Sequence, residues 1–224
     1  MPEKAILLHG LFRSRLSMLR MAWGLRAQGF DPERWGYSSR GGAATQLAAL
    51  RARLETLDTR DTVHFVGHSF GGILLRGALS APVPFPIGRI VMIGAPNHGA
   101  GVIARAGANP WLGWIMKGLG RTVLDLAPES PFLAKLGVPS AEIGVIAGTR
   151  RLYVVNPSAW INRFAGVAEP HDGTVEVAST RLAGMRDFIV LAADHTFISE
   201  YAETIRQTAH FLRHGRFDRG DGEL

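Results

Sequence analysis

The sequence predicts an α/β protein with a doubly wound, mostly parallel sheet of about six strands between two layers of helices. Two observations favour this fold class. Short apolar runs without polar alternation are typical of strands buried on both faces, and they alternate along the chain with segments of helical spacing. The expected strands lie over 5–8, 30–37, 63–66, 89–95, 144–148 and 188–192. Because ligands bind at the carboxyl ends of such strands, function is expected on the loops at that edge.

The expected helices are placed by the spacing of their apolar residues. Besides the helix that follows Ser69, they lie over 15–28, 43–57 and 199–214. In the first of these, Leu16, Leu19 and Trp23 are predicted to face the core. The strand over 30–37 is the weakest prediction, since Asp31-Pro32 interrupts its apolar pattern.

The regular alternation changes after the fourth expected strand. Asn109-Pro110 and Ser130-Pro131 each place an N-cap residue before a proline at the first helical position, which predicts a short helix at both places. We expect one domain over 1–224, in which the segment 99–139 is inserted as a helical cap. The alternatives of a mobile lid and of a cap packed permanently on the core both stay open.

The first helix of this insertion is strongly apolar. Its stripe includes Trp111, Trp114 and Ile115, and the insertion directly follows a strand that ends at the functional edge. We therefore predict that these three side chains bind substrate, as the wall of an apolar pocket.

Composition limits the classes of function. The chain has 224 residues and no cysteine, which excludes disulfides, thiolate metal sites and a cysteine nucleophile. The net charge of +6 comes mostly from scattered arginines without a nucleic-acid-binding motif, so no nucleic-acid partner is expected, while peripheral contact with an anionic membrane is compatible with this charge. No signal-peptide pattern and no run long enough to span a bilayer are present, so we expect a cytoplasmic protein. No cluster of metal ligands is evident, and oligomeric state stays open.

The stretch over 62–75, TVHFVGHSFGGILL, carries the strongest functional signal. It places the pattern G-x-S-x-G between a strand and a helix, which is the context of a nucleophile elbow. We expect Ser69 in a strained turn, with Gly67 and Gly71 where strand and helix crowd together. The alternative is an ordinary strand-to-helix turn that happens to contain serine.

A serine nucleophile needs a base, and the base needs an orienting acid. Of eight histidines, His195 follows the last core strand on a loop, so we predict that it is the general base. Asp172 precedes it, and the order Ser69, Asp172, His195 matches a known hydrolase order, so Asp172 is the predicted acid. Asp194 is a weaker candidate, because a side chain rarely folds back onto its neighbour's imidazole. The alternative for Asp172 is a plain Asp-Gly turn.

A tetrahedral intermediate also needs hydrogen-bond donors for its oxyanion. We predict the N–H groups of Phe70, next to the nucleophile, and of Leu11, in the loop after the first strand. His9 and Gly10 in the same loop are predicted to contact substrate, and Gly10 allows the backbone to approach closely.

The chain resembles the α/β-hydrolases, and among them the small bacterial lipases and esterases. The resemblance covers nearly the whole chain through LLHGL (7–11), GHSFGG (67–72), GAPNHG (94–99), DGTVEV (172–177) and DHTF (194–197), all in the family's order. It implies a reduced α/β-hydrolase fold and hydrolysis of small-molecule esters or lipids through an acyl-enzyme on Ser69, with no cofactor. Acyl transfer, thioester or amide cleavage by the same residues, and a hydrolase-fold binding protein without turnover, remain open.

Overall fold

The computed structural model describes residues 2–39, 41–109, 111, 114, 118, 120–154 and 156–220. In these residues the strands are β1 (Glu3–Leu8), β2 (Phe30–Trp35), β3 (Val63–His68), β4 (Ile87–Ile93), β5 (Ile143–Gly148) and β6 (Asp187–Leu191). They form one sheet in the order β2-β1-β3-β4-β5-β6, and every neighbouring pair is parallel. The predicted fold class and the six strands are thus confirmed.

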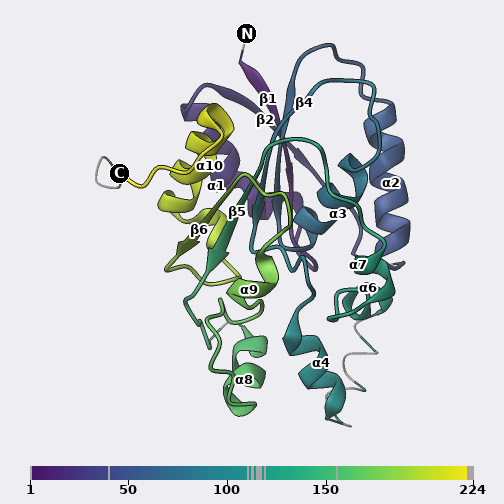
Figure 1. Ribbon diagram of the computed structural model, residues 1–224, viewed down its shortest axis with the longest axis vertical. Coiled ribbons are helices and arrows are strands. Elements are labelled where there is room, and N and C mark those ends of the chain that lie inside the picture. The colour runs from purple at the N-terminus through teal and green to yellow at the C-terminus, as the bar shows by residue number, and fades with distance from the viewer. Residues whose placement is uncertain are drawn as a thin grey trace.

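Helices cover both faces of this sheet (Figure 1). On one face lie α1 (Leu19–Ala27), preceded by a 3-10 turn over Arg15–Met18, and α10 (Ala202–His214), preceded by a 3-10 turn over Ile198–Glu200; on the other lie α2 (Ala43–Glu55) and α3 (Phe70–Leu79). Successive residues of β1 enter opposite cores, Ala5 and Leu7 on the α1 side, Ile6 and Leu8 on the α2 side. Burial on both faces explains why this strand is apolar without alternation.

Helix α1 and strand β2 each differ from expectation in one detail. Leu16 and Trp23 are exposed, and Met18, Met21 and Leu25 face the core instead. The 3-10 turn before α1 has fewer residues per turn than an α-helix, so it shifts which residues point inward.

The second detail concerns β2, which is an unbroken strand from Phe30 to Trp35 despite its proline. It is an edge strand of the sheet, and Pro32 pairs there with Ala5 of β1. An edge position tolerates proline because one side of the strand needs no ladder hydrogen bonds.

The segment between β4 and β5 holds α4 (Gly101–Ala108), α6 (Arg121–Leu124) and α7 (Pro131–Ala134). The helix predicted at Ser130-Pro131 is present, with Ser130 Oγ accepting a hydrogen bond from the Phe132 N–H at 3.2 Å. Most of the helix predicted from Asn109-Pro110 lies outside the described residues, and α4 before it was not predicted. In Figure 1, α6 and α7 lie beside α2, whereas α4 projects beyond the carboxyl ends of the strands.

After β5 the chain forms α8 (Pro157–Phe164) and α9 (Val177–Thr180) before it enters β6. The sequence analysis placed no helix between these two strands, so it missed α8. Asn156 caps α8 through its side chain, which accepts from the Ser158 N–H, and Pro157 occupies the first turn. These are the signals that define a helix start, and α8 and α4 together flank the space beyond the strand ends (Figure 1).

The contact between β3 and α3 depends on glycine at two positions. A Cβ at Gly67 would lie 2.5 Å from the backbone nitrogen of Gly72, and a Cβ at Gly71 would lie 2.5 Å from the carbonyl oxygen of His9. Real Cβ atoms do not approach backbone this closely, so helix and strand could not keep this separation with larger residues.

We therefore expect Gly67→Ala to lower the free energy of unfolding by about 1–3 kcal/mol or more, because the backbone of α3 must move. The matched control is Gly107→Ala in α4, where an added Cβ meets no atom within 4 Å. It should leave stability unchanged or raise it by about 0.5–1 kcal/mol. Urea unfolding measures both, and equal stability of Gly67→Ala and the wild type would contradict the packing argument.

Candidate active site

Ser69 lies in the turn between β3 and α3, at the carboxyl edge of the sheet. Its backbone has φ 52° and ψ −121°, a left-handed conformation that is rare for a residue other than glycine. The Ser69 N–H donates to the carbonyl oxygen of Ile93 at 2.8 Å, and the Ser69 carbonyl accepts from the Gly72 N–H at 2.9 Å. The turn is therefore held from both sides in the strained state that the sequence pattern predicts.

Three side chains form one continuous hydrogen-bonded chain. His195 Nε2 lies 3.0 Å from Ser69 Oγ, and His195 Nδ1 lies 2.7 Å from Asp172 Oδ2. Asp172 is fully buried. Since a carboxylate only accepts, Nδ1 carries the proton and Nε2 accepts from the serine hydroxyl. The structure thus brings the three predicted residues together in the geometry of a nucleophile, a base and an orienting acid.

The second oxygen of Asp172 is fixed by its own turn. Asp172 Oδ1 accepts from the N–H groups of Thr174 at 3.0 Å and Val175 at 2.8 Å. The Asp172 carbonyl also accepts from the His195 N–H at 3.0 Å. With these bonds the carboxylate has little freedom to turn away from the imidazole.

The Asp194 carboxylate makes its hydrogen bonds with groups other than His195. Its Oδ1 accepts from the N–H groups of Thr196 and Phe197, and its Oδ2 accepts from the hydroxyl of Tyr201. The geometry therefore agrees with the preference for Asp172 over Asp194 as the predicted acid.

His68 contacts the loop that carries His195. Its Nε2 lies 3.0 Å from the carbonyl oxygen of His195, and burial lowers the pKa of His68 to about 3. The ring is therefore neutral near pH 7, and the proton must sit on Nε2 to donate to that carbonyl. A neutral ring here adds no positive charge beside the base.

The loop after β1 lies against the serine turn. Leu11 lines the same cavity as Ser69, and a Cβ on Gly10 would lie 3.3 Å from Ser69 Cβ. The N–H of the next residue, Phe12, donates to Ser39 Oγ, and Phe12 has φ 57°. This strained loop therefore keeps the backbone of Leu11 close to the nucleophile.

Phe70 is the first residue of α3, so its N–H has no intrahelical acceptor. It points from the positive end of the helix dipole, which favours a developing negative charge. The position of Phe70 and Leu11 is compatible with the predicted oxyanion donors, whose role stays a prediction.

His9 does not reach the cavity. It is buried, its ring stacks on Tyr37 at a centroid distance of 4.2 Å, and its Nδ1 bonds the carbonyl of Gly10 at 2.8 Å. Tyr37 also donates its hydroxyl proton to the His9 carbonyl. Burial lowers the pKa of His9, so the ring supports the loop as a neutral group instead of contacting substrate.

A cavity of about 520 Å³ opens beside Ser69 and His195. Its walls come from four places: the loop after β1, α4 with the α6 region, α8, and the turn that follows Asp172. The lining residues, besides Ser69 and His195, are Leu11, Phe12, Pro96, Ala100, Val102, Ile103, Ala106, Val123, Leu126, Pro157, Ser158, Ile161, Thr174 and Val175. Nearly all are apolar, so the cavity suits a hydrocarbon group next to a reactive serine.

The predicted apolar wall is not the observed one. Trp111 and Trp114 are 83% and 76% exposed and do not line this cavity, while Ile115 lies outside the described residues. The walls that sequence reasoning missed come from α4 and α8. The Asn156-Pro157 pair was the available signal for α8, whereas α4 begins at Gly101 with no side-chain cap.

A polar clasp of Arg105, Asn162 and Glu176 joins the two helices of the cavity to the Asp172 turn. Arg105 Nε and Nη2 donate to Asn162 Oδ1 at 3.0 and 2.7 Å, and Arg105 also pairs with Glu176. Asn162 Nδ2 donates to the carbonyl of Gly173 at 3.2 Å. The clasp therefore fixes α4 and α8 relative to the residue next to Asp172.

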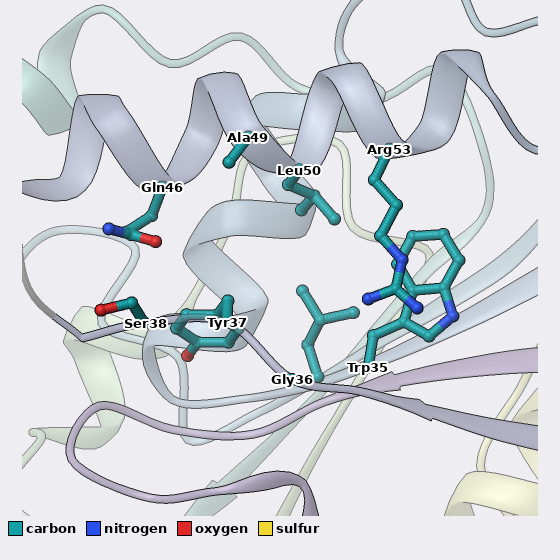
Figure 2. A pocket seen from close by; sticks show the side chains of 9 residues that line it. Trp35, Gly36, Tyr37, Ser38, Gln46, Ala49, Leu50 and Arg53 are labelled. Atoms are coloured by element: carbon teal, nitrogen blue, oxygen red, sulfur yellow. The ribbon is translucent and has the colours of Figure 1, made fainter.

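A second cavity, of about 310 Å³, lies between α2 and the end of β2 (Figure 2). The Arg53 guanidinium lies over the Trp35 ring at 3.8 Å from its centroid, and the amide of Gln46 faces the same space. Neither Ser69 nor His195 lines it. This cavity lacks the nucleophile and base that make the first one a candidate active site.

Within the described ranges, no group of three or more histidine, aspartate or glutamate side chains could hold a metal ion. Across those same ranges, no helix is long and apolar enough to cross a membrane.

Comparison with known proteins agrees with this arrangement. The alpha/beta hydrolase family matches residues 37–131. The mature form of lipase BlEst2 from Bacillus licheniformis is 19% identical with a TM-score of 0.77, over 95% of this chain and 91% of that one. Its propeptide form has a TM-score of 0.78 at 18% identity, over all of this chain but 52% of that one.

A carboxyl esterase from a metagenome, MGS0156, is 18% identical with a TM-score of 0.67, over 86% of this chain and 64% of that one. No curated protein sequence matches the chain. At these identities the structural likeness shows the fold alone, which is that of the α/β-hydrolases.

The clasp generates a prediction for stability. Asn162 is fully buried, so Asn162→Ala leaves the Gly173 carbonyl and part of Arg105 without partners. We expect a loss of about 1–3 kcal/mol in the free energy of unfolding, measured with urea.

Asn162→Asp is the graded comparison, because it keeps the acceptor for Arg105 and loses the donor to Gly173. It should fall between the wild type and Asn162→Ala. If both variants unfold at the wild-type urea concentration, the clasp does not hold the two helices.

Proposed function

We propose that this protein is an α/β-hydrolase that hydrolyses carboxylic esters through an acyl-enzyme on Ser69. The observation that carries the proposal is the hydrogen-bonded chain Ser69–His195–Asp172 at 3.0 and 2.7 Å, which opens on an apolar cavity of about 520 Å³. The family match and the lipase and esterase structures with the same fold support it.

In the first half-reaction, Ser69 Oγ attacks the ester carbonyl carbon while His195 Nε2 takes the hydroxyl proton. The imidazolium that forms is stabilised by the Asp172 carboxylate at Nδ1. Negative charge collects on the carbonyl oxygen, where the N–H groups of Phe70 and Leu11 are the proposed donors. The C–O bond to the alcohol then breaks, and His195 gives its proton to the leaving oxygen.

In the second half-reaction, a water molecule loses a proton to His195 and attacks the acyl carbon. The bond to Ser69 Oγ breaks, the serine recovers its proton from His195, and the carboxylic acid leaves. The apolar cavity formed by α4 and α8 is the proposed acyl site. In this proposal the segment 99–139 contributes to the acyl site through α4, not through Trp111 and Trp114.

The first test is a chain-length series of p-nitrophenyl esters, from acetate to palmitate, with wild type, Ser69→Ala, His195→Gln and Asp172→Asn. Ser69→Ala should abolish enzymatic turnover. His195→Gln and Asp172→Asn should lower kcat by about 10³–10⁴-fold or more, since both keep the shape but remove the base or its tautomer.

A fluorophosphonate label located by mass spectrometry accompanies this series. Labelling at Ser69 without ester turnover would shift the assignment to amides, thioesters or acyl transfer. Normal turnover by Ser69→Ala would contradict the proposal, and neither turnover nor labelling of the wild type would favour a binding protein.

A second test addresses the acyl site. Ala106 is fully buried and lines the cavity, so Ala106→Phe should fill part of it. We expect kcat/KM to fall at least about 10-fold for the longest ester cleaved and to change little for acetate, because each buried methylene contributes about 0.8 kcal/mol of binding.

Ala104→Phe, on the exposed face of the same helix, is the matched control and should keep the chain-length profile of the wild type. Equal profiles for all three proteins would place the acyl chain elsewhere.

A further inference from the structure

An aromatic strip is formed by the exposed Trp160 and Phe164 on the outward face of α8 and by the half-buried Tyr153 and exposed Val154 in the turn before it. Phe164 is 82% and Val154 is 91% exposed. The Trp160 ring lies 5.0 Å from the Tyr153 ring and 5.8 Å from the Phe164 ring, and Trp160 Nε1 donates to the Tyr153 carbonyl at 3.0 Å. The rings are thus held as one surface, and grouped large apolar side chains on an outer face mark an interaction site.

The opposite face of α8 lines the cavity. Pro157, Ser158 and Ile161 line the cavity beside Ser69, whereas Trp160 and Phe164 lie on the exposed side. The packing of α8 against the protein therefore does not account for the two outward aromatic rings. In Figure 1, α8 lies at the end of the molecule beyond the carboxyl ends of the strands.

The charge around the strip has one sign. Residues 143–168 contain no aspartate or glutamate, and they contain Arg150, Arg151 and Arg163. All three arginines are exposed. The Arg163 guanidinium lies 5.6 Å from the centre of the Tyr153 ring, and Arg151 also interacts with Tyr153, whereas Arg150 interacts with Tyr201 instead. The neighbouring segment 99–124, which contains α4, also has no acidic residue. Arg151 and Arg163 therefore place positive charge directly beside the aromatic rings.

This combination fits an anionic lipid surface. Tryptophan and tyrosine are stable at the boundary between headgroups and acyl chains, since they join an apolar ring to a polar N–H or O–H. Arginine is attracted to anionic headgroups within a short distance of the membrane. A protein partner would need acidic groups placed to pair with Arg151 and Arg163 beside the aromatic rings, whereas an anionic bilayer supplies negative charge at every position of its surface.

We propose that the aromatic strip and the arginines around it dock the protein on anionic lipid bilayers. Docking through this face places the cavity wall formed by α8 next to the bilayer. The binding step does not require the chemistry proposed for Ser69, so the two can fail separately.

The test is cosedimentation of the full chain with vesicles of phosphatidylcholine or of phosphatidylcholine and phosphatidylglycerol at 7:3. We expect binding to the anionic vesicles at least about 10-fold tighter than to the neutral ones, and weaker at high salt. Phe164→Ala and the pair Arg151→Gln with Arg163→Gln should each weaken anionic binding by about 5-fold or more. Trp23→Ala, an exposed tryptophan of α1, is the matched control and should bind as the wild type does.

Phe164 is 82% exposed, so its variant should keep the wild-type melting temperature, which is checked first. Equal binding to neutral and anionic vesicles, no binding, or equal loss in Trp23→Ala would overturn the proposal. A dimer that Phe164→Ala dissociates, without vesicle binding, would assign the strip to a second copy of the chain instead. Ser69→Ala should bind vesicles normally, which separates docking from catalysis.

Discussion

The close contact between β3 and α3 is the constraint on which the candidate site depends. Gly67 and Gly71 let the helix start within backbone distance of the strand and of the His9 carbonyl. Only this separation forces the chain into the sharp turn that gives Ser69 its φ of 52°. The strain is local, but the surrounding sheet fixes it, because the Ser69 N–H is bonded to Ile93 on the next strand.

The remaining parts of the site are connected to the sheet by hydrogen bonds more than by apolar packing. The Asp172 turn is stabilised by its own N–H groups, by Asn162 of α8 and by the His195 backbone. The His195 carbonyl in turn accepts from His68, which burial keeps neutral. The Asp172 carboxylate, the His195 ring and the His195 carbonyl thus each have a defined partner, which limits the reorganisation needed when charge develops.

The sequence was sufficient to predict the sheet and the convergence of Ser69, Asp172 and His195. This was possible because parallel strands carry a continuous apolar pattern and end at one edge, so residues after different strands meet there. The functional roles of these residues stay a prediction. The inward face of the first helix was predicted wrongly, since a 3-10 turn before Leu19 shifts its periodicity.

The walls of the cavity were harder to predict than the sheet edge that carries Ser69 and His195. Apolar composition does not tell which way a helix outside the main sheet turns, and Trp111 and Trp114 proved to be exposed, not part of the cavity. The helix start at Asn156-Pro157 carried a readable signal, but the local sequence does not tell where a helix packs, so its place beside Ser69 was missed. Such positions depend on tertiary contacts, here the clasp between Arg105 and Asn162.

The clasp also bears on how substrate reaches Ser69. An opening motion that separates α4 from α8 would break the bonds of Arg105 to Asn162 and leave a buried amide without its partner. That cost acts against α4 and α8 parting as a mobile lid, and it would also disturb the turn that holds Asp172. A clasped pair of helices can instead remain in place while a ligand enters the cavity beside the outward face of α8, which carries Trp160 and Phe164. Fixed walls and an apolar, positively charged outer face are therefore compatible parts of one arrangement.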